Sequence, residues 1–297
     1  MTTHFFPRLE RFLERPWVEK RQILWQKVRQ EWRALPTLRR VEPGFLFVVR
    51  GDDAVRDAVL SGEFEKMERQ FVQRYLRSGM TVLDVGAYFG IYALTASVKV
   101  GPTGRIVAFE PSDKQRRGLR LNLFLNGCRN VRTEKLALSN VAGAAKFFVA
   151  TGGAEGFSGL RRPEVGSAVR SMDVKTAILD DYLEQYGIAT VDLIKVDVEG
   201  GELDFFRGAR KLLGQANSPI ILCELQNIRS RSWGHTARQT ADFVRQFGYR
   251  WFRPLPGGSI AAMPSEPESY DGNFVAVPAG RIESVKEMIE DGSAVPH

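Results

Sequence analysis

Acidic residues follow two apolar stretches in the second half of the chain, at positions where they could do chemistry. Asp197 and Glu199 belong to the string KVDVEG at residues 195–200, and Glu224 follows the stretch PIILC. In an open α/β sheet, ligands bind at the carboxyl ends of the strands. A carboxylate there can hold a cofactor's amino group, orient an acceptor hydroxyl or take its proton. Strand alternation points Asp197 and Glu199 to opposite faces unless the strand has already turned, so we expect at least one of them to face the site.

A second feature is the string VLDVGAYFG at residues 82–90, in which an apolar strand ends in a glycine turn and leads into a predicted helix. Gly86 can take backbone angles closed to other residues and leaves room above the strand end, while Gly90 lets the start of the helix pack closely. A turn of this kind either brings backbone close to a bound cofactor or only satisfies the geometry of a tight connection.

Glu110 ends the next apolar strand, residues 105–109, roughly twenty residues after the glycine turn. Doubly wound nucleotide-binding folds place an acid there, where its carboxylate accepts hydrogen bonds from the hydroxyls of a ribose. The same charge would repel a ribose phosphate, which argues against an NADP site. The alternative is that Glu110 caps the helix expected to begin near Pro111 and Ser112.

Four strings, DVGAYFGIYAL, VAFEPS, ALSN and DLIKVDVEGGELDFFRGA, together resemble the FkbM-type methyltransferases. The resemblance runs over residues 62–277. It implies a Rossmann-like class I methyltransferase fold that uses S-adenosylmethionine and releases S-adenosylhomocysteine. It also implies that the methyl acceptor is a hydroxyl of a sugar, a glycan or a polyketide-like natural product.

The resemblance further implies which residues bind the cofactor, and most of them come from strand ends. The glycine turn would line the methionine end, Glu110 and the two residues after it would hold the ribose and the adenine edge, and Leu136 with Ala137 would flank the adenine ring. Glu65 would close over the cofactor, or else it is an exposed acid at a helix start. The complete set is Glu65, Asp84, Gly86, Ala87, Tyr88, Gly90, Glu110, Pro111, Ser112, Leu136, Ala137 and Asp197.

Methyl transfer from a sulfonium needs little covalent help from the protein, because the methyl carbon is already electrophilic and placement dominates. A neutral hydroxyl still loses its proton, so we expect a general base. Asp197 is the first candidate for this base, followed by Glu199, Glu224 and His235. A lone loop histidine such as His235 is more often simply solvated.

Two positions depart from the pattern of the family. Tyr88 stands where the glycine turn commonly carries Asn, so we expect its ring to stack over the cofactor or to shape the acceptor pocket. Gln226 stands two residues after Glu224, where histidine is frequent in relatives. If that histidine is the base elsewhere, this chain uses another residue or methylates a different acceptor.

The elements that must position these residues alternate along the chain. From Met80 onward, short apolar stretches alternate with helical patterns, which predicts a doubly wound α/β fold with a mostly parallel sheet and antiparallel final strands. Residues 62–297 would form this domain, and residues 1–61 a helical, basic extension. Residues 151–171 are glycine-rich and lack periodicity, which predicts a long flexible loop near the site.

The formal net charge is +7, and Arg and Lys residues crowd positions 1–40. This basic face is either simply solvated or contacts a membrane surface or another partner. The sequence contains no apolar stretch long enough to span a membrane and no signal pattern, and Cys128 and Cys223 are far apart. We therefore expect a cytoplasmic protein without disulfides, and the sequence leaves open whether it forms a homo-oligomer.

Other functions fit parts of this pattern. A nucleic-acid methyltransferase would use the basic extension to follow phosphates, but the sequence has no Asn/Asp-Pro-Pro-Tyr string and no cysteine placed as a pyrimidine nucleophile. An inactive cofactor-binding scaffold protein would dock through the same extension. A dehydrogenase has less support, because Tyr88 replaces the second glycine that a pyrophosphate needs. Asp197, Glu199 and Glu224 could gather Mg²⁺, but opposite strand faces argue against a shared site, so we expect no metal.

Overall fold

The computed structural model describes residues 16–19, 21, 37–41, 45–49, 54–151, 154–166, 168–263 and 270–290. Most of the predicted N-terminal extension lies outside these residues. Near its end, strand Thr37–Val41 (β1) pairs antiparallel with strand Phe45–Val49 (β2), and helix Ala54–Ser61 (α3) follows.

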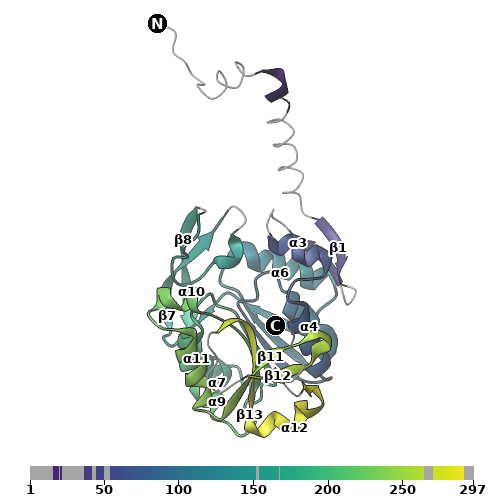
Figure 1. Cartoon of the computed structure of the whole chain (residues 1–297), viewed down its shortest axis with the longest axis vertical. Coiled ribbons are helices and arrows are strands. Elements are labelled where there is room, and N and C mark those ends of the chain that lie inside the picture. The colour runs from purple at the N-terminus through teal and green to yellow at the C-terminus, as the bar shows by residue number, and fades with distance from the viewer. Residues whose placement is uncertain are drawn as a thin grey trace.

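The centre of the fold is a sheet in which the described strands have the order β14-β12-β11-β13-β10-β9-β3-β4-β5 (Figure 1). The strands β5, β4, β3, β9 and β10 run parallel, and β13 lies antiparallel between β10 and β11. The bounds are Thr81–Val85 (β3), Arg105–Phe109 (β4), Val131–Glu134 (β5), Leu193–Val196 (β9), Ile220–Gln226 (β10), Tyr249–Pro254 (β11), Ile260–Ala262 (β12), Asp271–Pro278 (β13) and Ile289–Glu290 (β14). The predicted doubly wound fold is confirmed. The late strands β11, β12 and β13 pair antiparallel as expected, whereas the short β14 pairs parallel with β12.

Alternating side chains of the central strands contribute to two separate cores. On β3, Val82 packs into the core on one face, and its neighbour Leu83 packs into the core on the other. Helices cover both faces of the sheet, so the central strands are buried on both sides. For this reason their sequences are continuous runs of apolar residues. The helices of the first core are Lys66–Tyr75 (α4), Ile91–Val100 (α5) and Asp113–Leu125 (α6). Those of the second are Leu179–Gln185 (α7), Glu202–Arg207 (α8), Arg210–Leu213 (α9) and Ala237–Arg245 (α11).

The direction of winding changes beside β3. Strand β4 follows on one side of β3, and β9 lies on its other side. In doubly wound sheets a crevice forms at such a switch point, outside the carboxyl ends of the strands. The fold therefore brings the glycine turn after β3 and the acids after β9 to the same crevice.

A small second sheet lies between β5 and α7 in the chain. Its strands are Ala137–Leu138 (β6), Gly143–Ala150 (β7) and Val169–Ala177 (β8), in the order β6-β8-β7. A 3-10 turn, Glu155–Phe157 (η1), leads to Gly159, which exchanges two backbone hydrogen bonds with Phe148 of β7. Most of the described residues of the predicted loop have no regular structure, as expected, and only η1, the bridge at Gly159 and the first residues of β8 depart from the prediction. Near Gly159 the segment folds back onto β7 through backbone hydrogen bonds. Such pairing needs no side-chain periodicity, so the sequence pattern did not predict it.

The segment after β10 faces this small sheet. It consists of helix Asn227–Ser230 (α10) and the 3-10 turn Arg231–Trp233 (η2), and Figure 1 shows α10 beside β7 and β8. Helix Ile282–Val285 (α12) lies near the end of the described chain. Among the described residues, no helix combines the length and the apolar character that a membrane crossing requires.

Candidate active site

A cavity of about 220 Å³ opens at the carboxyl ends of β3 and β9 and extends under the small sheet. Most residues of the predicted site line it, although they come from distant parts of the chain. They are Glu65, Asp84, Gly86, Ala87, Tyr88, Glu110, Pro111, Ser112, Leu136, Ala137, Asp197, Glu199 and Glu224. Gly90 and His235 do not line the cavity.

Gly86 and Gly90 allow the backbone around the turn to pack closely. Both have φ in the left-handed region, at +80° and +90°. A Cβ on Gly86 would overlap the carbonyl oxygen of Asp197, so this glycine lets the ends of β3 and β9 meet. A Cβ on Gly90 would overlap the side chain of Leu119 on α6, in agreement with the expected close packing of the helix. This contact supports the packing role of Gly90, and because Gly90 does not line the cavity, its assignment to the cofactor stays a prediction.

Asp84 is buried beneath the turn and bonds to the helix that follows it. Its Oδ2 accepts a hydrogen bond from the backbone N–H of Ala93 in α5, at 2.9 Å. Burial raises the pKa of Asp84 to about 7, and the positive charge of Lys195 opposes part of this rise. The carboxyl group therefore fixes α5 against β3, and the residue borders the cavity as well.

Glu110 connects the glycine turn to the start of α6. Its Oε2 accepts from the backbone N–H of Tyr88 at 2.9 Å, and its Oε1 accepts from that of Ser112 at 2.8 Å. Burial raises the pKa of Glu110 to about 8, while these two hydrogen bonds act in the opposite direction. Each carboxylate oxygen keeps a second lone pair. The side chain can therefore hold the helix start and still accept from a ligand in the cavity.

Three residues other than glycine have left-handed backbone in the described part of the chain, and all three line the cavity. They are Glu65, Tyr88 and Glu199, with φ of 42°, 49° and 59°. Such conformations cost about 1–3 kcal/mol each and cluster at functional sites. Asn tolerates left-handed backbone better than Tyr does, so the Asn that the resemblance to FkbM-type methyltransferases leads us to expect at this position would carry less strain.

Glu65 reaches into the cavity from the segment before α4. Its Oε2 accepts from the hydroxyl of Tyr92 at 2.5 Å, and its Oε1 accepts from Asn273 Nδ2 at 3.4 Å. The side chain makes no capping hydrogen bond to α4. Of the two interpretations of Glu65, its contacts favour a residue that closes over the cavity.

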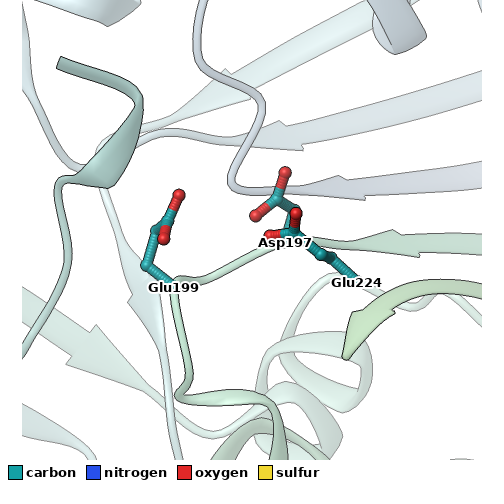
Figure 2. Close-up of side chains that lie close together, drawn as sticks. All are labelled: Asp197, Glu199 and Glu224. Carbon is teal, nitrogen blue, oxygen red and sulfur yellow. The ribbon is translucent and has the colours of Figure 1, made fainter. Parts of the chain in front are cut away.

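Asp197, Glu199 and Glu224 meet at one wall of the cavity (Figure 2). One carboxylate oxygen of each lies within 4.8 Å of the corresponding oxygens of the others. Strand β9 ends at Val196, and the chain turns at Glu199, which has left-handed backbone, so strand alternation does not separate Glu199 from Asp197. Asp197 and Glu199 therefore do not point to opposite faces. Both line the cavity, which is the case that the sequence analysis allowed for a strand that has already turned.

Two basic side chains that were not predicted balance these acids. Lys195 Nζ is buried and lies 3.1 Å from Asp197 Oδ2. Arg229 forms an ion pair with Glu199 and places its Nε 3.9 Å from Glu224 Oε2. Burial lowers the pKa of Lys195, but the surrounding carboxylates, led by Asp197, raise it above its usual value. Lys195 could have been found from the sequence, because it lies two residues before Asp197 and therefore on the same strand face.

The acid cluster is close enough for a hard cation to contact all three carboxylates. Two protein cations, however, already lie within this cluster, so charge balance does not require a metal. Burial, followed by the charge of Asp197, raises the pKa of Glu199 well above its usual value and that of Glu224 to about 9. The predicted reason for expecting no metal, opposite strand faces, does not hold, and the absence of a metal stays a prediction.

His235 is not placed to act on a ligand in the cavity. Its Nε2 is buried without a hydrogen-bond partner among the described residues, and burial lowers its pKa. Trp233, two residues earlier, lines the cavity and donates its indole N–H to the backbone oxygen of Glu199 at 3.2 Å. A Cβ on Gly201 would come within 2.9 Å of this indole, so the glycine leaves space for the ring. Because His235 does not line the cavity, the structure gives no support to its prediction as a base.

Aromatic and basic side chains connect the small sheet to the segment after β10. The guanidinium of Arg229 lies 4.5 Å from the ring centre of Phe157, and that of Arg161 lies 5.2 Å from Trp233. Both contacts are within the range of cation–π attraction. Sequence periodicity gave no signal for these pairs, because each joins two irregular segments.

Comparisons with known proteins place this site in a family. The model of the Methyltransferase FkbM domain matches residues 84–251, more than half of the chain. The methyltransferase sdnD of Sordaria araneosa is 30% identical over 185 residues, which cover 48% of this chain and 70% of sdnD. The 2-O-methyltransferase NoeI of Sinorhizobium fredii is 27% identical over 160 residues, 50% of this chain and 65% of NoeI.

Two further likenesses are more partial. The AMB antimetabolite synthetase AmbE of Pseudomonas aeruginosa is 27% identical over 200 residues, which cover 57% of this chain but only 9% of AmbE. A solved O-methyltransferase from Bacillus cereus has a TM-score of 0.42 and 15% identity, over 71% of this chain and 80% of that one. The matched residues 84–251 include the glycine turn, Glu110 and the three acids. The chain belongs to the FkbM family of methyltransferases.

Proposed function

We propose that this chain transfers a methyl group from S-adenosylmethionine to a hydroxyl of a sugar, a glycan or a polyketide-like natural product, and releases S-adenosylhomocysteine. The observation that supports this most is the single cavity that joins the glycine turn and Glu110 to the three acids. Membership of a methyltransferase family supports the reaction type. The relative NoeI carries the description 2-O-methyltransferase, which favours oxygen as the acceptor atom.

The residues of the cavity fit this cofactor. Glu110 keeps lone pairs for ribose hydroxyls, and Leu136 with Ala137 offers apolar surface to the adenine. Asp197 Oδ1 is buried and has no hydrogen-bond partner among the described residues. Buried polar atoms are normally hydrogen-bonded, so this oxygen is suited to accept a hydrogen bond from a ligand. The primary ammonium of the cofactor can donate that hydrogen bond. When bound, the cofactor supplies an electrophilic methyl group on a sulfonium.

The acceptor is oriented by the wall beyond the acids. Phe157, Trp233 and Arg229 line this part of the cavity, and the side chain of Phe157 is 38% exposed. Aromatic rings at a partly open edge can stack on the apolar face of a sugar ring or of another cyclic acceptor. The proposed partner of this wall is therefore a small molecule or a glycan, and the basic N-terminal extension is proposed to contact a membrane surface or another partner.

Calorimetric titration with S-adenosylmethionine, S-adenosylhomocysteine and NAD tests the proposal. We expect the intact chain to bind the first two and not NAD, and Glu110→Ala to weaken both interactions. Glu63→Ala is a suitable control, because Glu63 is exposed and lies outside the cavity. An intact protein that binds none of these ligands would contradict the proposal.

The acceptor class is tested with methyl-labelled S-adenosylmethionine and a panel of glycans, hydroxylated natural products and RNA. Label in the glycans or natural products would support the proposal. Label in RNA alone would favour a nucleic-acid methyltransferase. Cofactor binding without any conversion to S-adenosylhomocysteine would favour a scaffold protein.

A further inference from the structure

The three acids of the cavity differ in their partners. Asp197 Oδ2 lies 3.1 Å from the buried ammonium of Lys195, and Glu199 is paired with Arg229. Glu224 Oε1 accepts instead from the neutral amide of Gln226, at 3.0 Å. The nearest cation to Glu224 Oε2 is Arg229 Nε at 3.9 Å, which is beyond hydrogen-bond distance. Glu224 is thus the one member of the cluster without a hydrogen-bonded cation among the described residues.

This difference in partners separates the acids by the oxygens that they leave open to a ligand. An oxygen that is hydrogen-bonded to a cation is already engaged, whereas Glu224 Oε2 has no such partner among the described residues. All three acids border the cavity, and the exposed fraction of the side chain is 16% for Glu224, 13% for Glu199 and 27% for Asp197. Asp197 Oδ1 also lacks a partner, but the proposed function gives it the ammonium of the cofactor. Glu224 Oε2 is then the carboxylate oxygen that is best placed to receive a proton from the acceptor.

Arg229 determines how Gln226 meets Glu224. The guanidinium Nε donates to Gln226 Oε1 at 2.6 Å, and a guanidinium can only donate. The amide oxygen is therefore committed to Arg229, and the amide N–H₂ must face Glu224 Oε1. In this orientation Gln226 is a donor to the carboxylate and leaves Oε2 open. Contact with Phe157 at 4.5 Å holds the guanidinium in place.

We propose that Glu224 takes the proton of the acceptor hydroxyl, and that Gln226 and Arg229 are positioning residues that aim it. This inference rests on the proposed function. In the step, the hydroxyl oxygen forms a bond to the methyl carbon, and the carbon–sulfur bond breaks with its electron pair left on sulfur. The O–H bond of the acceptor breaks, and its proton goes to Glu224 Oε2. The sulfonium charge and the carboxylate charge are both lost, so the step is balanced.

The same geometry couples donor binding to the protonation of Glu224. Burial and the charges of Asp197 and Glu202 raise the pKa of Glu224 to about 9, while Lys195 and Arg229 act in the opposite direction. This raised pKa favours the protonated form of Glu224 before the donor binds. A positive sulfonium in the cavity favours its carboxylate form, whereas the neutral thioether of the product does not. Donor binding should release this proton and prepare the base.

Proton release is measured by titration calorimetry at pH 7.5 in three buffers of different ionisation enthalpy. We expect S-adenosylmethionine to release up to about one proton more than S-adenosylhomocysteine. In Glu224→Gln this difference should vanish while S-adenosylhomocysteine still binds, which also shows that the variant is folded. The control is Glu184→Gln, which changes an exposed carboxylate that does not line the cavity, and it should keep the difference in proton release.

The outcomes of this experiment are distinguishable. A difference that persists in Glu224→Gln would overturn the assignment and place the proton on another acid. Equal proton release for both ligands in the intact chain would also overturn it. Failure of the intact chain to bind either ligand would instead contradict the proposed function itself.

The positioning role of Gln226 has its own readout, the ratio of the two ligand affinities as a function of pH. In the intact chain, preference for S-adenosylmethionine over S-adenosylhomocysteine should rise by about tenfold as Glu224 ionises. Gln226→Ala removes a donor to the carboxylate, so the midpoint of this rise should move to higher pH. A merely structural role would change both affinities equally and leave the midpoint in place, which would overturn the positioning role.

Discussion

The two halves of the cavity are built by different means. In the cofactor half, Asp84 and Glu110 accept hydrogen bonds from backbone N–H groups. In the acceptor half, Glu199 and Glu224 meet the side chains of Arg229 and Gln226. Asp197, which we propose binds the ammonium of the cofactor, lies where the two halves join and is paired with Lys195. Backbone partners are fixed by the fold, whereas side-chain partners change with a single substitution. The first half suits a ligand that stays constant, and the second half suits an acceptor that differs among relatives.

The largest effect is expected where the two halves join. Gly86→Ala adds a Cβ that overlaps the carbonyl oxygen of Asp197, at a φ of +80°. We expect a loss of about 3–5 kcal/mol in the free energy of unfolding, measured with urea. Gly62→Ala is a matched control, because Gly62 has a φ of +82° and open space around it. It should lose only about 1–2 kcal/mol. Equal losses would show that backbone conformation alone matters at Gly86.

Substitution within each half should affect different ligands. Glu110→Gln replaces a carboxylate that accepts two backbone hydrogen bonds with an amide that has only one acceptor oxygen. We expect the affinity for S-adenosylhomocysteine to fall by about 10- to 100-fold. Glu199→Gln, in the acceptor half, should change this affinity by less than about threefold. Calorimetry checks both variants, and an equal loss in the two would contradict the division of the cavity.

The cofactor half should also make the empty protein sensitive to pH. Folding raises the pKa of Asp84 from 3.8 to about 7 and that of Glu110 from 4.5 to about 8, in both cases through burial. Both groups bind a proton more tightly when the chain is folded, so their stabilising effect is complete at low pH and is lost as the pH rises through these values. The melting temperature should therefore fall between pH 5 and pH 8.5. Glu110→Gln should flatten this fall, and an unchanged slope would contradict the assignment.

The smallest effect concerns the strained turn. Tyr88 has a φ of 49°, which glycine adopts without strain and other residues do not. Tyr88→Gly and Tyr88→Ala both remove the ring, but only the first removes the strain. Tyr88→Gly should therefore be more stable than Tyr88→Ala by about 1–2 kcal/mol in urea unfolding. A less stable glycine variant would show that the backbone is not strained at this position.

The sequence predicted the cofactor half better than the acceptor half. The glycine turn and Glu110 each lie directly after an apolar strand, and strand ends in such a fold gather at one edge. The acceptor half was predicted only as acids near that edge. Residue order could not show that the chain turns at Glu199, or that Trp233 and not His235 borders the cavity.

By itself, the sequence determined the alternation of strands and helices, and with it the edge of the sheet at which the site forms. Apolar periodicity and glycine placement are local properties, and they are readable without the fold. Only the tertiary structure decided which charges meet there. The ion pair of Arg229 with Glu199 joins residues 30 positions apart, and the contact of Gly86 with Asp197 joins two neighbouring strands that are far apart in the chain. Such contacts depend on strand order and on irregular turns, for which side-chain periodicity carries no signal.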